Sequence, residues 1–402
     1  KVTNASVTAY ANVKPASHAD DRTTVMTYDN AGRLKQTTDA EGLVTLNYYN
    51  GIGDLVHQEY RTDAEVRRER HFYDAGLLRG TLDREGYFTE FFYDKSGRQT
   101  ATRAYAKQTT EGLRITGSFS ELLSGLADNA NDLQTFTFYN GRGQVQAHVD
   151  AEGYVTEYEY DLNEQLARET RYANRATNAA SVNQFASLNH GSHASDQTTR
   201  HWYDQKGRLV QTTDHQNLVS IFRYDADDNL VESSVGVDSG ADLRHKRYFR
   251  YNQGGQLVGE LNGRGSRVLG DEASNAQVDA KLATQGTRYV YDLAGRKIQS
   301  IDANGNRSFL YYDAAGRLAV SVNGLGAAQL SEYNAFGDVV KTTHYGNRLT
   351  VSELSGGNVA EVLPKLAAIA NDALDVHTEF AFNARGQIKQ AIDALGYRSD
   401  NV

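Results

Sequence analysis

The chain has 402 residues, with 25 Tyr, 36 Gly, 2 Pro and no Cys, and its formal net charge is -9. Without Cys it can form neither disulfides nor thiolate metal sites, and no apolar run reaches the roughly 18 residues of a membrane-spanning helix. The densest basic run is Arg67, Arg68 and Arg70, which Glu65 and Glu69 interrupt. We therefore predict neither a membrane span nor nucleic-acid binding.

A short motif recurs along the chain: an aromatic residue, then Asp or Asn, two further residues and Gly. Many copies are 21 residues apart, as are Tyr28 and Tyr49. Three copies are degenerate, because the one at Tyr73 lacks a residue and Glu164 and Asp228 replace the Gly of two others. The aromatic residues, which we call the anchors, are Tyr28, Tyr49, Tyr73, Tyr93, Tyr139, Tyr160, Tyr203, Tyr224, Tyr251, Tyr291, Tyr312, Tyr333 and Phe382.

Each period contains a second turn, Asp-x-x-Gly, eleven residues after the anchor, as at Asp39 to Gly42. Asp at the first position can accept hydrogen bonds from its own turn, and Gly at the fourth supplies the positive φ of a type I turn with a G1 bulge. The segments between turns, such as 43–49, have the length and composition of strands. The sequence predicts a mainly β fold, a long curved antiparallel β-hairpin ribbon with short helical insertions, in one continuous array over 1–402. Two reversing turns per period argue against a parallel β-helix.

Strand alternation places each anchor on one face with the residues two and four positions before it, as for Thr89, Phe91 and Tyr93. On neighbouring hairpins such residues form cross-strand pairs. We therefore interpret the anchors as a structural ladder rather than as sugar-stacking aromatic residues.

Four gaps between anchors are about twice the usual length, and we expect helical inserts near 111–134, 176–198, 270–285 and 351–377. In the first, a capping box at Ser118 to Glu121 begins a helical pattern. In the last, Pro364 is tolerable only in a first turn or at a kink. We expect the inserts to cover apolar sheet surface rather than to bind a partner. The apolar stripes are Phe119, Leu122, Leu123, Leu126, Ala130 and Leu133 in the first insert, and Val359, Val362, Leu366, Ile369 and Leu374 in the last.

Two polar clusters have the side chains of a metal site, but their context favours ordinary loops. His190, His193 and Asp196 lie in a Ser- and Asn-rich loop. The oxygen-rich run at 225–229 (Asp225, Asp227, Asp228 and Asn229) occupies a regular turn position without a following bidentate Glu. We predict no catalytic, cofactor-binding or metal-binding residue. The arginines that follow the turn Gly should pair with turn carboxylates; they are Arg33, Arg98, Arg208, Arg296 and Arg317.

The run Tyr-Asp-x-x-Gly-Arg-Leu, followed by Asp-x-x-Gly and Thr-x-Tyr-x-Tyr-Asp, resembles the YD repeat of the RHS family. Tyr28 to Gly42 is one clean copy, and Tyr312 begins another. The resemblance implies a hollow, spiralling shell of antiparallel strands, as in insecticidal toxin complexes, polymorphic toxins and teneurins. In bacterial members it implies an enclosed toxic C-terminal domain that a Pro- and Asp-containing segment cuts free. No Asp-Pro-x-Gly sequence occurs here, so self-cleavage is assigned to no residue.

Two functions remain open from the sequence. The first is a non-catalytic shell segment of a larger bacterial RHS-repeat protein, which encapsulates or presents a C-terminal effector or toxin. The alternative is a cell-surface adhesion or carbohydrate-binding repeat region. The expected partners are the rest of the same polypeptide and an encapsulated effector, or a glycan or cell-surface ligand. Both functions place the chain outside the cell, secreted or at the surface, as a fragment of a larger protein.

Overall fold

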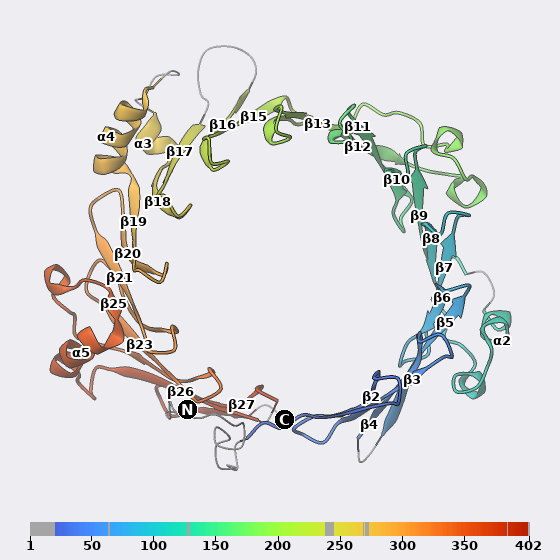
Figure 1. The fold of residues 1–402 in the computed structure, drawn as a ribbon, viewed down its shortest axis with the longest axis horizontal. Helices are drawn as coiled ribbons and strands as arrows, with labels where there is room; N and C mark the ends of the chain where they lie inside the picture. Colours follow the sequence, from blue (N-terminus) through green and yellow to red (C-terminus); the bar gives the residue numbers. More distant parts are fainter. Residues whose placement is uncertain are drawn as a thin grey trace. The chain divides into compact units, whose positions relative to one another are not determined.

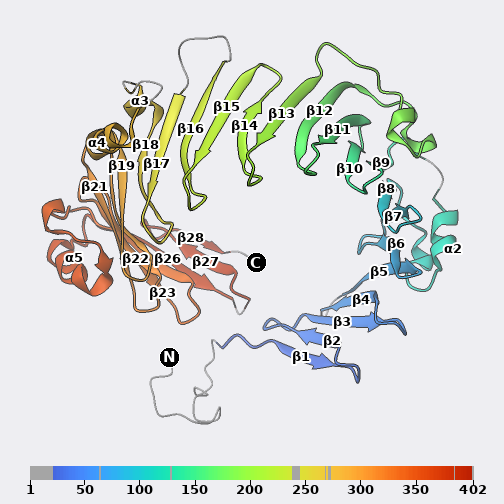
Figure 2. The same cartoon turned by 45° about the horizontal axis from the view of Figure 1, so that its top comes forward.

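The structure is a computed structural model that describes residues 21–62, 65–126, 129–237, 245–267, 269, 273–383 and 385–400. Its internal contacts divide the chain into two compact units. The N-terminal unit is Thr23–Val219, and the C-terminal unit combines Lys1–Arg22 with Ser220–Val402. Each unit is a succession of strands with short helices on one face of its sheet (Figures 1 and 2). In the described part of the chain, no helix is long and apolar enough to cross a bilayer.

In the N-terminal unit each strand pairs antiparallel with the next. Its strands are β1 (Val25–Tyr28), β2 (Leu34–Thr38), β3 (Val44–Tyr49), β4 (Leu55–Arg61), β5 (Val66–Asp74), β6 (Leu77–Leu82), β7 (Phe88–Tyr93), β8 (Gln99–Ala104), β9 (Leu133–Tyr139), β10 (Val145–Val149), β11 (Tyr154–Tyr160), β12 (Leu166–Arg175), β13 (Gln197–Tyr203) and β14 (Leu209–Thr213). Strand β15 (Leu218–Tyr224) contains the boundary between the units.

The C-terminal unit repeats this order of antiparallel neighbours, with β24 pairing β26 across an insert. Its strands are β16 (Leu230–Val237), β17 (His245–Tyr251), β18 (Leu257–Leu261), β19 (Thr287–Tyr291), β20 (Lys297–Ile301), β21 (Arg307–Tyr312), β22 (Leu318–Val322), β23 (Ala328–Tyr333), β24 (Val339–His344), β25 (Gly357–Asn358), β26 (Val376–Phe382), β27 (Ile388–Ile392) and β28 (Arg398–Asp400). The short β25 is the exception, because it pairs parallel with the end of β21. The predicted fold class, antiparallel hairpins with short helical insertions, is confirmed.

The hairpin turns have the predicted chemistry. In the first described turn, Asp29 Oδ1 accepts from the backbone N–H groups of Ala31 and Arg33 at 2.9 and 3.0 Å. Gly32 has a φ of 76° and donates its N–H to the carbonyl of Asp29 at 3.0 Å. The register then shifts by one residue between Thr27 and Tyr28, which is the expected bulge. The turn residues therefore fix both the reversal and the register of each hairpin.

The degenerate copies keep the reversal by different means. Glu164 and Asp228, which stand in the place of Gly, adopt the left-handed region with φ of 66° and 65°. The copy that lacks a residue forms a two-residue turn instead, with positive φ at both Ala75 and Gly76. Two positive values in succession are the geometry of a type I′ turn, which suits the twist of a hairpin. The deletion thus changes the turn type and preserves the hairpin.

Replacing Glu164 by glycine is expected to stabilise the chain by about 0.5–1 kcal/mol. A left-handed conformation costs a residue with a Cβ roughly 1–2 kcal/mol, and the greater freedom of glycine in the unfolded chain offsets part of the gain. The matched control is Gly32→Ala, because a Cβ there meets nothing within 4 Å and only the φ of +76° opposes it. That variant should lose about 1 kcal/mol. Urea unfolding of both variants measures whether each change raises or lowers the free energy of unfolding. A destabilised Glu164→Gly variant would contradict the interpretation that Glu164 is strained by its positive φ.

The inserts contain less helix than predicted. Helix α2 (Phe119–Ser124) begins with the predicted capping box at Ser118 but is followed by Gly125, so the extension of the stripe to Leu133 is wrong. Leu133 instead begins β9, because its segment pairs with β8. The helix expected near 176–198 does not form either, since the structure has only the 3₁₀ turns η2 (Ala179–Ser181) and η3 (Phe185–Ser187) there. The Asn178 side chain bonds the backbone of Ser187 and Asn189, which competes with a helix.

The two later inserts agree better with the sequence. Helix α4 (Asn275–Gln285) confirms the helix expected near 270–285, where 270–272 lie outside the described residues, and α3 (Gly263–Ser266) precedes it. Helix α5 (Leu363–Ile369) has Pro364 in its first turn, as predicted. Leu374 lies beyond the end of α5 and is 54% exposed, so its place on the apolar stripe is wrong. The remaining 3₁₀ turns are η1 (Glu111–Leu113), η4 (Val351–Glu353) and η5 (Val359–Glu361).

Each insert buries apolar side chains against the sheet of its own unit, as predicted. Among the described residues four clusters form in this way, each joining sheet residues to residues of an insert. The inserts lie on one face of the sheet of their unit (Figure 1). Their buried members are Leu82, Phe88, Tyr105, Leu122 and Leu126; Phe138, Ala147, Val149, Val155 and Leu188; Tyr248, Leu261 and Val278; and Phe309, Tyr311, Val320, Val322, Ala328, Leu349, Leu354, Val362 and Leu366. The core is therefore divided into insert-covered patches.

Candidate functional site

Eight of the anchor tyrosines donate their hydroxyls to the main chain of the preceding hairpin. In β21, Tyr311 is buried under the last insert, whereas its neighbour Tyr312 donates its hydroxyl to the Lys297 carbonyl at 2.7 Å. The same bond, at 2.6–3.0 Å, joins Tyr49 to Leu34, Tyr93 to Leu78, Tyr139 to Gln99, Tyr160 to Val145, Tyr203 to Leu166, Tyr291 to Leu257 and Tyr333 to Leu318. Each of these hydroxyls links one hairpin to the one before it.

The turn arginines complete this connection. Arg317 pairs with its own turn carboxylate, Asp313, at 2.6 Å, and its guanidinium carbon lies 4.5 Å from the ring centroid of Tyr333 in the next repeat. Its Nη1 also donates to the Asn334 carbonyl at 3.1 Å. Arg33, Arg98 and Arg296 make the same ion pair and stack on the following anchor in the same way. With Arg208, which pairs with Asp204, the predicted arginine–carboxylate pairing is confirmed.

Glutamine occupies the arginine position in other repeats and bonds the next turn directly. Gln165 Nε2 donates to the carbonyl of Gly207, and Gln256 Nε2 to that of Gly295, both at 2.9 Å. This role was not predicted from the sequence. The signal is present, however, because Gln165 and Gln256 stand at the position that Arg occupies in other turns, and both side chains are long and can donate hydrogen bonds.

The turn aspartates are held in their charged form by these contacts. Donation from the backbone N–H of Arg98 to Asp94, with that of the Arg98 side chain, lowers the pKa of the carboxyl. The same causes lower the pKa of Asp204 beside Arg208. At Asp292 the guanidinium of Arg296 is the larger cause of the lowered pKa, followed by its backbone N–H. A carboxylate that accepts several N–H groups is stabilised relative to its protonated form.

The two polar clusters considered for metals are ordinary loops. Asp196 accepts from the backbone N–H groups of Ala173 and His193, both at 2.8 Å, and His190 packs edge-on against Tyr172. Asp225 Oδ1 accepts from two backbone N–H groups of its own turn, as the other turn aspartates do. Within the described ranges no group of three or more His, Cys, Asp or Glu side chains could hold a metal ion.

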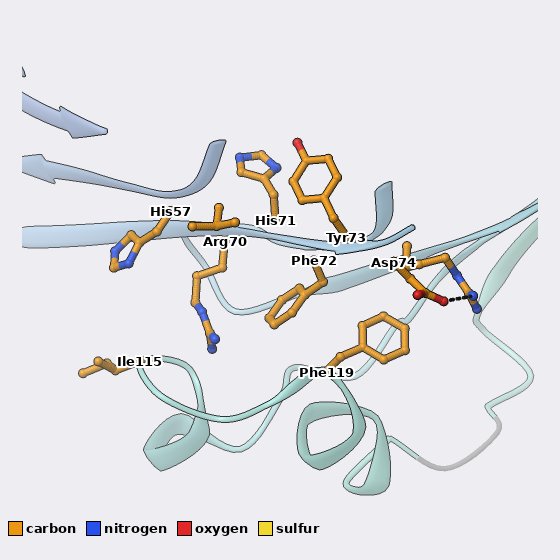
Figure 3. A pocket seen from close by; sticks show the side chains of 10 residues that line it. His57, Arg70, His71, Phe72, Tyr73, Asp74, Ile115 and Phe119 are labelled. Atoms are coloured by element: carbon orange, nitrogen blue, oxygen red, sulfur yellow. Dashed lines mark ion pairs between the residues drawn. The ribbon is translucent and has the colours of Figure 1, made fainter. Parts of the chain in front are cut away.

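A pocket of about 580 Å³ lies in the N-terminal unit between β4–β6 and the insert that carries α2 (Figure 3). Arg70 and Phe72 of β5 point toward the insert, where Ile115 and Phe119 face them, whereas His71 and Tyr73 point to the other side of the strand. The ring centroids of Phe72 and Phe119 are 5.9 Å apart. Asp74 and Arg79 close one end with an ion pair at 3.5 Å.

Two basic side chains of this pocket, Arg70 and His57, are incompletely paired. The Arg70 guanidinium lies 4.7 Å from the Phe72 ring centroid, and its Nη1 donates to the Arg114 carbonyl at 3.3 Å. It makes no ion pair with any residue that the structure describes, and desolvation lowers its pKa. Nε2 of His57 is 3.5 Å from a Glu59 oxygen but forms no hydrogen bond within the described chain. Burial lowers the pKa of His57, so the ring is neutral at pH 7.

Sequence reasoning missed this pocket because its two sides are far apart in the chain. The signal is the basic run at 67–70, although glutamates interrupt it in the sequence. Strand alternation separates Arg68 and Arg70 from Glu69, so the interruption does not neutralise them. Arg68 pairs with Glu59 on the neighbouring strand, and Arg70 makes no ion pair with a described residue.

Comparison with known proteins relates the repeat to one family. The sequence model of the family described as RHS Repeat matches residues 139–177 and 203–237. No curated protein matches the chain in sequence. Among solved structures, one of the Photorhabdus luminescens Tc holotoxin pore, with a mutation in TccC3, is similar over 93% of this chain and 19% of its own, with a TM-score of 0.55 and 14% identity. A crystal structure of TcdB2–TccC3 without its hypervariable C-terminal region is 15% identical over 94% of this chain and 22% of its own, with a TM-score of 0.48.

The chain therefore spans about a fifth of the length of the structures that it matches. At such low identity the Photorhabdus structure shows a common fold, and the family match identifies the repeat in two segments of the chain. The matched segments contain the anchors Tyr139, Tyr160, Tyr203 and Tyr224, and the same turn and anchor pattern recurs outside them. By this match, residues 139–177 and 203–237 are RHS repeats.

Proposed function

We propose that the chain is a non-catalytic structural segment of a larger bacterial RHS-repeat protein, secreted or displayed at the cell surface, and that its hairpin array encapsulates or presents a C-terminal effector. The observation that carries the proposal is the likeness of fold to the Tc holotoxin structure over 93% of this chain. That chain is about five times longer, so the effector and the remainder of the polypeptide are the partners we propose. The repeats over 1–402 would then act as one continuous array.

The contacts of the repeat support a structural role. Asp, Arg and Tyr side chains, which can serve in catalytic sites, are here engaged with their own or neighbouring hairpins. Asp313, Arg317 and Tyr333, for example, join two successive turns through an ion pair, a ring contact and a main-chain hydrogen bond. We propose that all thirteen anchors are structural in this sense. A surface that binds glycans would instead need aromatic rings free of such contacts.

Limited proteolysis of a polypeptide that carries this array with its native downstream sequence tests the proposal. We expect the downstream region to resist protease while the array is folded and to be cut once urea unfolds the array. An unrelated domain expressed alone gives the cleavage rate of a polypeptide that the array does not protect. Equal cleavage rates with the array folded and unfolded would contradict encapsulation. Binding of the folded array to a glycan or cell surface, together with an unprotected downstream region, would establish the adhesion alternative.

A further inference from the structure

We propose that the pocket between β4–β6 and the α2 insert binds a small organic monoanion, a carboxylate carried on an aromatic or branched apolar body. The anchor Tyr73 lines this pocket, but the proposed ligand contacts are made by other residues. The existence of the site does not depend on whether the array encloses an effector.

The first argument is the balance of charge around Arg70. Glu59 is 5% exposed and already pairs with both Arg61 and Arg68. Asp74 pairs with Arg79, and Glu69 lies on the other face of β5 near His71 and Arg84. Each of these carboxylates thus has a basic neighbour, whereas Arg70 makes no ion pair with a residue that the structure describes. A partly desolvated guanidinium without a counter-ion gains most from an anion that enters the site.

The second argument concerns the charge and shape of the anion. A guanidinium presents a planar pair of donors that matches a carboxylate, and His57 has an unpartnered Nε2 on the strand next to Arg70. One cation and one neutral imidazole suit a single negative charge. Phosphate carries close to two negative charges at pH 7, and the Asp74 carboxylate at the pocket's end would repel the second. A carboxylate is therefore preferred over phosphate.

The third argument is the apolar lining. Phe72 and Phe119 form the wall beside Arg70, and Ile115 projects from the insert with 54% of its surface exposed. An exposed isoleucine at the rim can cover the apolar part of a ligand and lose its own contact with water. A volume of about 580 Å³ is in the range of pockets that hold small organic ligands. Carboxylate recognition and apolar burial can thus occur together.

Titration of the chain with 2-naphthoate and with its neutral analogue 2-naphthamide tests the proposal by calorimetry or ligand-observed NMR. We expect 2-naphthoate to bind with a Kd below about 1 mM and 2-naphthamide to bind at least about tenfold more weakly, as for one lost charge-assisted contact. Arg70→Met should weaken 2-naphthoate by about tenfold or more and leave 2-naphthamide unchanged. Ile115→Ala should weaken both by about threefold.

The matched control is Arg67→Met on the same strand, because Arg67 is exposed and pairs with Glu65 and Glu85 away from the pocket. It should change the Kd by less than about twofold. Equal binding of the two ligands to the unmodified chain would overturn the proposal, and this comparison does not depend on any variant folding. So would equal effects of Arg67→Met and Arg70→Met, or displacement of 2-naphthoate by an equal concentration of inorganic phosphate.

Discussion

Replacing Tyr311 by alanine should lower the free energy of unfolding by about 3–5 kcal/mol, the range for truncation of a large buried aromatic side chain. Tyr311 is 1% exposed and belongs to the cluster that joins β21 and β22 to the last insert. Its removal leaves a cavity bordered by Phe309 and Val320 on the sheet and by residues of the insert. Because the insert is held on the sheet by this cluster, we expect it to detach locally before the hairpins separate.

The adjacent anchor provides the control, because Tyr312 lies on the opposite face of the same strand. Tyr312→Ala removes the hydroxyl bond to the Lys297 carbonyl and the ring contact with Arg296. These losses amount to about 1–2 kcal/mol at a half-buried position. Urea unfolding followed by circular dichroism compares the two variants. A greater loss for Tyr312→Ala would mean that the anchor ladder, and not the insert-covered face, provides most of the stability.

The hairpins could be predicted because their chemistry is local. An Asp that accepts its own turn's N–H groups and a Gly with positive φ define the reversal within five residues, as Asp29 and Gly32 show. The strands then follow from what lies between two such turns. Local rules even explain the degenerate copy at Ala75, where the loss of one residue replaces the type I turn and its bulge by a two-residue type I′ turn.

The inserts and the pocket depend on distant contacts, which the sequence pattern does not contain. Leu133 continues a helical spacing from Phe119, yet pairing with β8 draws it into a strand. Likewise, Arg70 becomes unpaired only because the carboxylate of Glu59 on β4 is occupied by Arg61 and Arg68. Periodicity predicts which residues share a face of one element. It does not predict which partner a charged side chain finds across the sheet.

The array should lose stability in acid because its turn carboxylates have lowered pKa values. The pKa of Asp94, Asp204 and Asp292 is lower in the folded chain than the ordinary value of 3.8. A group with a lowered folded pKa stabilises the fold at pH values above its unfolded pKa, and this contribution is lost as pH falls through the folded pKa. Urea midpoints should therefore be constant above about pH 5 and fall progressively below about pH 4.

Asparagine at these three positions separates the charge from the turn geometry. The chain already uses Asn252 in an equivalent turn, where its Oδ1 accepts from the N–H groups of Gly254 and Gln256 at 3.0 Å. The triple variant Asp94→Asn, Asp204→Asn, Asp292→Asn should keep its hairpins and lose only exposed ion pairs at pH 7, each a small contribution. Its urea midpoint should fall less steeply between pH 5 and pH 2 than that of the unmodified chain, because three fewer carboxylates take up protons. Parallel pH curves for the two proteins would show that other groups, such as Glu59 between its two arginines, control acid unfolding instead.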